Sequence, residues 1–148
     1  TPKGAEDPIN RAVRFGGRPK REKVMLEIIP NLDDKLLAVY CKKCGKLHGP
    51  SFYLYLAINR GETLAAGLFE VESDRVNVVY YESVEEDPHL FDAVLRAGLN
   101  YAAEHGISKG YLPEAFRSHH RAFFAKLNYP PQSIFDITNF FRKYKSCN

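Results

Sequence analysis

The pattern of apolar and polar positions predicts alternating strands and helices between residues 25 and 141. Three apolar and aromatic segments, Phe52–Asn59, Thr63–Val71 and Val76–Tyr81, are separated by short polar turns. This spacing is typical of an antiparallel meander of three strands. Apolar residues then recur at helical spacing over Pro88–Glu104. Asp87 is a good N-cap for that helix, and Pro88 suits its first position.

Shorter elements are predicted on both sides of this central section. Met25–Ile29 alternates as a strand, and Asn31 can cap a helix that ends near Cys44-Gly45. The remaining predictions are a strand over Ser108–Leu112, a helix over Glu114–Leu127 and a final strand over Ile134–Phe141. The predicted order is β-α-β-β-β-α-β-α-β. It indicates an α/β (α+β) fold, a mixed sheet in which an antiparallel meander leads into a right-handed β-α-β crossover.

Charge divides the chain into a basic N-terminal arm, residues 1–24, and one domain, residues 25–148. The arm carries seven Lys or Arg against three Asp or Glu, whereas the formal net charge of the whole chain is +3. The domain is therefore close to neutral, which speaks against nucleic acid as a partner. We find no apolar run of membrane-spanning length and no secretory signal pattern, and we expect a soluble, cytoplasmic protein.

Three cysteines give no disulfide framework, but the Cys41-Lys-Lys-Cys44-Gly pattern has the spacing of half a zinc site. His48 and Cys147 are the candidates for the third and fourth ligands. A second Cys-x-x-Cys is absent, so a redox pair and two plain thiols at a helix end stay open as alternatives. The plain thiols are favoured over zinc.

The segment from Ser83 to His89 joins the third meander strand to the long helix, the place where α/β proteins commonly bind a phosphate. Such turns are usually rich in glycine, because the backbone must approach the ligand closely. This turn contains no glycine and three consecutive acids, Glu85, Glu86 and Asp87. Its position indicates a cofactor site, whereas its composition disfavours an anion.

Several local sequences match one known family. Phe124-Ala-Lys-Leu-Asn-Tyr129 resembles a Tyr-x-x-Leu-Gly-Phe ending of the last helix, Val94–Ala102 resembles the body of a cofactor-binding helix, and Gly67-Leu-Phe resembles a second meander strand. With the order of elements, these segments resemble the Gcn5-related N-acetyltransferase (GNAT) superfamily over about Met25–Phe141. The stretch Asp87–Ala102 is also similar to small bacterial members from anaerobic Firmicutes.

The resemblance implies transfer of an acetyl group from acetyl-CoA to a small amine. In the family, the end of the third meander strand contacts the pantetheine arm and the following helix start holds the pyrophosphate. The residues implied as cofactor-binding are Tyr80, Tyr81, Ser83, His89 and Leu90. A carboxylate on the sheet edge serves as general base, for which the candidates are Glu82 and Glu114. Members often pair through their last strand, here Ile134–Phe141, so a homodimer is an expectation.

The chain departs from the family pattern where the chemistry occurs. Glu86 stands in place of an Arg or Gln, and His89 and Phe91 stand in place of two glycines of the pyrophosphate loop. Phe124 replaces a general-acid tyrosine, and Arg117 stands near a usual asparagine. Two main hypotheses follow: an acetyl-CoA-dependent N-acetyltransferase with a divergent pyrophosphate loop, or a catalytically silent domain that binds a ligand or partner. A zinc-stabilised interaction module is the third.

Overall fold

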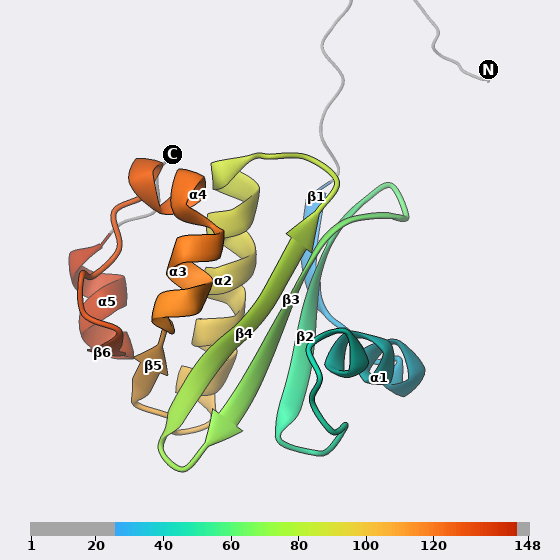
Figure 1. The fold of residues 1–148 in the computed structure, drawn as a ribbon, viewed down its shortest axis with the longest axis horizontal. Coiled ribbons are helices and arrows are strands. Elements are labelled where there is room, and N and C mark those ends of the chain that lie inside the picture. Colours follow the sequence, from blue (N-terminus) through green and yellow to red (C-terminus); the bar gives the residue numbers. More distant parts are fainter. Residues whose placement is uncertain (1–25, 145–148) are drawn as a thin grey trace, which may run out of the picture.

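The structure is a computed structural model that describes residues 26–144. Within this range the chain forms six strands and five helices (Figure 1). Their bounds are β1 Leu26–Pro30, α1 Asp34–Lys43, β2 Phe52–Asn59, β3 Glu62–Glu72, β4 Arg75–Ser83, α2 Pro88–Glu104, β5 Lys109–Tyr111, α3 Glu114–His119, α4 Arg121–Lys126, β6 Ile134–Asp136 and α5 Ile137–Lys143. None of these helices combines the length and the apolar character needed to cross a membrane.

All six strands belong to one mixed sheet in the order β1-β2-β3-β4-β5-β6. Neighbours are antiparallel except for β4 and β5, which run parallel and pair only over Arg75–Asn77 and Lys109–Tyr111. Leu68 pairs with Tyr80 whereas Phe69 pairs with Val78, so Val79 is an extra residue and β4 has a bulge there. Beyond Asn77, no described strand pairs with the β5 side of β4. Helices α3 and α4 lie beside this part of the strand instead (Figure 1).

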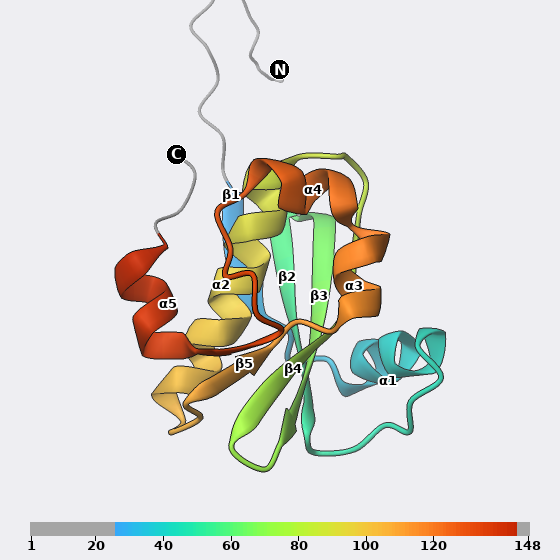
Figure 2. The same ribbon diagram turned by 60° about the vertical axis from the view of Figure 1, so that its left-hand side comes forward.

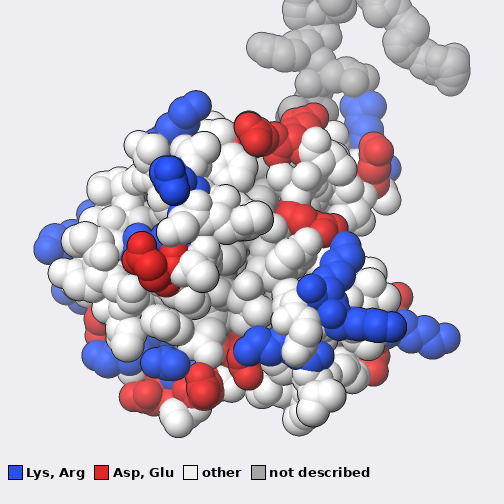
Figure 3. All heavy atoms as spheres, in the orientation of Figure 1, with Lys and Arg blue, Asp and Glu red and all other residues white. Residues whose placement is uncertain are grey.

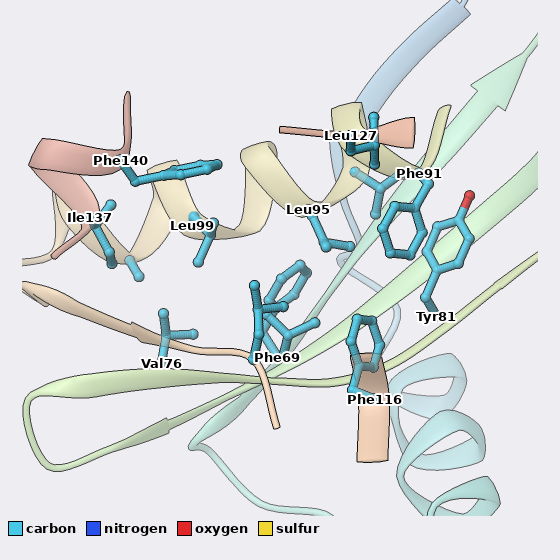
Figure 4. Close-up of a cluster of buried hydrophobic side chains, with 14 of the residues drawn as sticks. Phe69, Val76, Tyr81, Phe91, Leu95, Leu99, Phe116, Leu127, Ile137 and Phe140 are labelled. Carbon is cyan, nitrogen blue, oxygen red and sulfur yellow. The ribbon is translucent and has the colours of Figure 1, made fainter. Parts of the chain in front are cut away.

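Helices cover both faces of the sheet. In Figure 2, α2 and α5 lie on one side of the central strands and α1 lies on the other. The main core lies between α2 and the sheet, where Phe69, Phe91 and Leu95 are fully buried (Figure 4). Gly98 is required for this packing, because a Cβ at that position would lie 2.0 Å from Cζ of Phe69.

The predicted mixed sheet and its central elements are confirmed. The three meander strands pair antiparallel, and α2 spans Pro88–Glu104 as the pattern indicates. Asp87 is its N-cap, with a carboxylate oxygen that accepts a hydrogen bond of 2.9 Å from the backbone N–H of His89. The short polar turns and the Asp-Pro helix start are therefore strong local signals in this chain.

The predicted final strand over Ile134–Phe141 is wrong after Asp136. The strand β6 ends at that residue, and helix α5 follows at once. The Asp136 carboxylate caps the helix by accepting a hydrogen bond of 2.8 Å from the N–H of Asn139. Ile137 and Phe140, three residues apart, are both buried, so the apolar spacing here is helical and not alternating.

Two predicted helix boundaries are also corrected. Asn31 does not cap α1. The cap is Asp33, whose carboxylate accepts hydrogen bonds from the N–H groups of Lys35 and Leu36. The helix expected over Glu114–Leu127 is broken at His120 into α3 and α4.

The break at His120 has a packing consequence. It places the rings of Phe116 in α3 and Phe123 in α4 against the same ring of Phe91, with centroids at 6.1 and 4.6 Å. Residues 1–25 and 145–148 lie outside the described residues. The predicted arm and its boundary with the domain therefore stay predictions.

Candidate functional site

Two neighbouring cavities lie beside the second half of β4. The first, which we call the turn-side cavity, has a volume of about 420 Å³ and is lined by Tyr80–Ser83, Glu86, His119, His120, Ala122 and Phe123. The second, the sheet-face cavity, has a volume of about 510 Å³. Its lining comes from β3, β4, β5, α3 and Lys46. Both volumes are in the range of small-molecule sites.

The two cavities share three lining residues, Tyr80 of β4 and the adjacent His119 and His120 at the end of α3. They therefore meet where β4 has lost β5 as a neighbour and has α3 and α4 beside it instead. We call these three residues the junction. The turn-side cavity and the sheet-face cavity are therefore in contact at the junction.

Glu82 lies beside the junction and is held by three donors. Its carboxylate accepts hydrogen bonds of 2.7 Å from the hydroxyls of Tyr40 and Tyr80, and of 3.0 Å from Nζ of Lys43. Partial burial raises the pKa of the Glu82 carboxyl, but these three hydrogen bonds outweigh it and bring the pKa below its usual value. Glu82 is consequently a stable anion and a weak base.

His120 is an uncharged imidazole among aromatic rings. Its ring lies 4.7 Å from Phe116, 5.4 Å from Phe91 and 5.8 Å from Tyr81, measured between centroids. Burial, together with the neighbouring His119, lowers the pKa of His120 to about 4. At neutral pH the wall of the junction is therefore aromatic and carries no charge at His120.

Tyr81 contributes a buried hydroxyl to the turn-side cavity. The residue is 3% exposed, and within residues 26–144 its hydroxyl oxygen has no partner at ordinary hydrogen-bond geometry. Burial raises the pKa of Tyr81 to about 12, an effect that the nearby Ser83 hydroxyl partly offsets. The hydroxyl is thus protonated at neutral pH and can donate to a ligand.

The end of the sheet-face cavity far from the junction carries two cationic and two anionic side chains. Arg75 pairs with Glu72 at 3.3 Å and lies over the ring of Tyr111 at 4.4 Å, while Lys46 and Glu70 are 3.8 Å apart. Two cations thus face two anions. The cavity has a polar end at the β3–β4 turn and an aromatic end at the junction.

The structure separates the residues predicted to bind the cofactor. Tyr80, Tyr81 and Ser83 line the turn-side cavity, whereas His89 and Leu90 line a different hollow on the other side of the α2 start. The five residues therefore do not form one surface, and their role stays a prediction.

The two predicted bases are separated as well. Glu82 lines the turn-side cavity, but Glu114 is exposed at the start of α3 and lines another hollow with Arg117 and Phe124. In that hollow Arg117 donates hydrogen bonds to the carbonyls of Pro130 and Gln132 and so fixes the following loop.

The cysteine pattern forms no metal centre among residues 26–144, where no group of three or more His, Cys, Asp or Glu side chains is placed to hold an ion. Cys41 is buried and Cys44 partly so, and burial raises the pKa of both thiols. His48 pairs with Asp34 at 2.8 Å, and Cys147 falls outside the described residues.

Sequence reasoning identified the side of the sheet but missed the partners of Glu82. Tyr80 and Glu82 are two residues apart on a strand, so their common face was predictable. Tyr40 and Lys43 come from α1, about forty residues earlier in the chain. No spacing rule links them to β4, and their contact with Glu82 emerges only from the fold.

Comparison with solved structures decides the fold. No model of a known protein family matches the chain, and no curated protein matches it. The ribosomal-protein-S18-alanine N-acetyltransferase from Escherichia coli is similar, with 14% identity and a TM-score of 0.53 over 76% of this chain and 88% of that one. A probable acetyltransferase from Staphylococcus epidermidis is similar at 12% identity and a TM-score of 0.50, over 69% and 82% of the two chains. The fold is that of the GNAT acetyltransferases. At this level of identity the similarity establishes the fold, and the activity has to be argued from the cavities.

Proposed function

We propose that this GNAT-fold chain transfers an acyl group from a thioester of the acyl-CoA class to an amine. The observation that carries the proposal is the pair of cavities that meet at Tyr80, His119 and His120. Transfer between two molecules requires both to be held side by side, and this juxtaposition can supply several kcal/mol of the barrier reduction. The turn-side cavity is assigned to the thioester and the sheet-face cavity to the amine.

In the reaction, the amine nitrogen attacks the thioester carbonyl carbon, a C–N bond forms and the C–S bond breaks. The amine loses one proton and the leaving thiolate takes one up, so the products are an amide and a free thiol. The junction is the part of the molecule where these atoms would meet. Its aromatic wall, with His120 neutral, favours the unprotonated and reactive form of the amine by desolvation, whereas the Glu82 carboxylate beside it favours the protonated form.

His119 is the proposed acceptor of the amine proton, in preference to the predicted Glu82 and Glu114. His119 is exposed and lines both cavities, and an imidazole nitrogen can accept a proton. Glu82 is engaged by three donors, so its proposed role is to hold the Tyr80 side chain at the junction. Glu114 lines neither cavity.

The test is a pair of measurements on the full chain. Calorimetry would report binding of acetyl-CoA, CoA and acetylpantetheine, and release of free thiol in the presence of a panel of primary amines would report turnover. Binding and turnover of at least one thioester are expected. Absence of heat and of thiol release with every thioester would contradict the proposal.

The base assignment has its own test. We expect His119→Gln to lower kcat by at least about tenfold, because general-base catalysis commonly contributes 10²–10⁴, and to leave the KM for both substrates nearly unchanged. His105→Gln is the matched control, since His105 is exposed at the far end of α2. An unchanged kcat for His119→Gln would remove His119 from this role.

A second function is favoured by one observation. The α2 N-terminus is capped by its own Asp87 and preceded by Glu85 and Glu86, a poor environment for a diphosphate. A domain that binds a ligand or partner without turnover fits this turn equally well. Calorimetric binding of a thioester without thiol release for any amine would support that alternative.

A further inference from the structure

The turn that follows β4 is closed by its own atoms. The Ser83 hydroxyl donates to the carbonyl of Glu85 at 2.5 Å. At the helix start, the Asp87 carboxylate accepts the N–H of His89, and Pro88 has no N–H to offer. The N–H of His89 is one of the first N–H groups of α2, the groups that would otherwise bind an anion.

The same turn carries negative charge at the mouth of the turn-side cavity. Glu86 lines that cavity, and Glu85 beside it is exposed. Figure 3 shows acidic side chains over the end of β4 and the turn that follows it. A phosphate group leaving the cavity on this side would approach carboxylates, and like charges at short range repel even across water.

The inner part of the cavity has a different character. Tyr80, Tyr81 and Phe123 form aromatic walls, and the hydroxyl of Tyr81 lacks a hydrogen-bond partner at ordinary geometry within residues 26–144. Beyond Asn77, the backbone edge of β4 has no strand beside it in the described part of the chain. An unpaired strand edge and a buried hydroxyl both suit the amide and carbonyl groups of an uncharged chain.

We propose that the turn-side cavity takes an uncharged, amide-containing thioester arm and selects against the diphosphate of a nucleotide-bearing donor. This inference rests on the proposed function, because it assigns the thioester to this cavity. The uncharged part of the thioester supplies the favourable binding free energy. The acidic turn repels any anionic group attached to it.

The experiment compares two donors that share the same arm. Acetylpantetheine is uncharged and acetyl-CoA carries the nucleotide and its phosphates. On the full chain at low salt, acetylpantetheine is expected to have an affinity and a kcat/KM at least equal to those of acetyl-CoA. A preference for acetyl-CoA of more than about tenfold, as a stabilising phosphate site of roughly 1.4 kcal/mol would give, overturns the inference.

Two variants test whether the charge of the acidic turn causes this ligand preference. Glu86→Gln is expected to shift the ratio of the two affinities toward acetyl-CoA by about fivefold, and salt near 0.5 M is expected to remove most of that shift. Glu104→Gln removes the same charge at the other end of α2, about 24 Å along the helix from Pro88 at the helical rise, and is expected to leave the ratio unchanged. Equal ratios for Glu86→Gln and Glu104→Gln would refute the role of the acidic turn.

Failure of the two proposals can be told apart. If neither donor binds or is turned over, the proposed function and this inference both fail. If both donors are turned over and acetyl-CoA is strongly preferred, the proposed function stands and the inference fails. If acetylpantetheine binds without turnover, calorimetry still decides the ligand preference, and the chain is a binding domain.

Discussion

Protonation of His120 is expected to destabilise the fold in mild acid. Burial lowers the pKa of His120 to about 4, against about 6.5 for an imidazole in the unfolded chain. Between these two values the unfolded state binds the extra proton and the folded state does not. The free energy of unfolding should therefore fall as the pH is lowered from about 6.5 to about 4.

The size of the effect follows from the pKa difference. A shift of 2.5 pKa units corresponds to about 3.4 kcal/mol when the proton is fully taken up. His120 is only half-buried, so water screens part of this penalty. We expect a loss of about 1–2 kcal/mol between pH 7 and pH 4.5 that is attributable to this imidazole.

The assay is urea denaturation of the unmodified chain and of His120→Phe at a series of pH values between 4.5 and 7. Phenylalanine keeps a ring against Phe91 and Phe116 and removes the titrating group. The difference between their unfolding free energies reports the pH dependence that His120 adds, together with its interaction with His119. The difference should change by about 1–2 kcal/mol across this range, in favour of the variant at low pH.

His105→Gln is the control, because it removes an exposed histidine at the end of α2. A pH dependence altered as much in His105→Gln as in His120→Phe would show that the effect is not specific to the junction. If the curve for His120→Phe runs parallel to that of the unmodified chain, the His120 imidazole is solvated in the folded state. The description of the junction as an uncharged aromatic wall would then be wrong.

Two further perturbations test the packing around the cavities. Tyr40→Phe removes one hydrogen bond to the Glu82 carboxylate and should lower the free energy of unfolding at pH 7 by about 1–2 kcal/mol. The pKa of Glu82 is depressed in the fold, so this loss should become smaller as the pH falls below the usual carboxyl range; a loss that is the same at every pH would contradict the role of the carboxylate. Gly98→Ala places a Cβ against the ring of Phe69 and should lower the free energy of unfolding by about 1–3 kcal/mol, measured by denaturation. Gly49→Ala, where nothing lies within 4 Å, is its control, and equal effects of the two alanines would contradict the tight fit at Gly98.

The elements that the sequence predicts correctly are those with strong local signals. Helix α2 has seventeen residues of helical spacing, a capping aspartate and a proline at its first position, so its bounds were fixed without tertiary information. The segment after Ile134 lacks such length. The spacing of Phe135 and Ile137 fits a strand, whereas the spacing of Ile137 and Phe140 fits a helix. The capping hydrogen bond of Asp136 selects the helix. Short apolar segments fit both the strand period of two residues and the helix period of about 3.6 residues, and only the packing of the folded chain distinguishes the two.

The sequence indicates where the candidate site lies but not which residues form it. The period of two along β4 places Tyr80 and Glu82 on one face, and the structure shows that this face contacts α1. The break at His120 and the bulge at Val79 shape the junction, and neither has a signature in the sequence. In the sequence, Glu82 looks like a carboxylate that is free to act as a base. In the fold, hydrogen bonds from Tyr40 and Lys43 of α1 hold it as an anion.

A cleft beside β4 and an anion site at the start of α2 have separate physical origins, so a chain of this fold can have the first without the second. The cleft follows from topology, because β5 ends at Tyr111 while β4 continues to Ser83 past its bulge. The anion site would depend on a handful of side chains in the turn. In this chain the Asp87 carboxylate already binds the N–H of His89, and Pro88 has no N–H, so two of the first positions of α2 need no bound anion. Exchanging the turn residues therefore changes which ligand the cleft accepts at little cost to the fold. The ligand preference of this chain should accordingly be sought in the charge of residues 85–87 and not in the shape of the sheet.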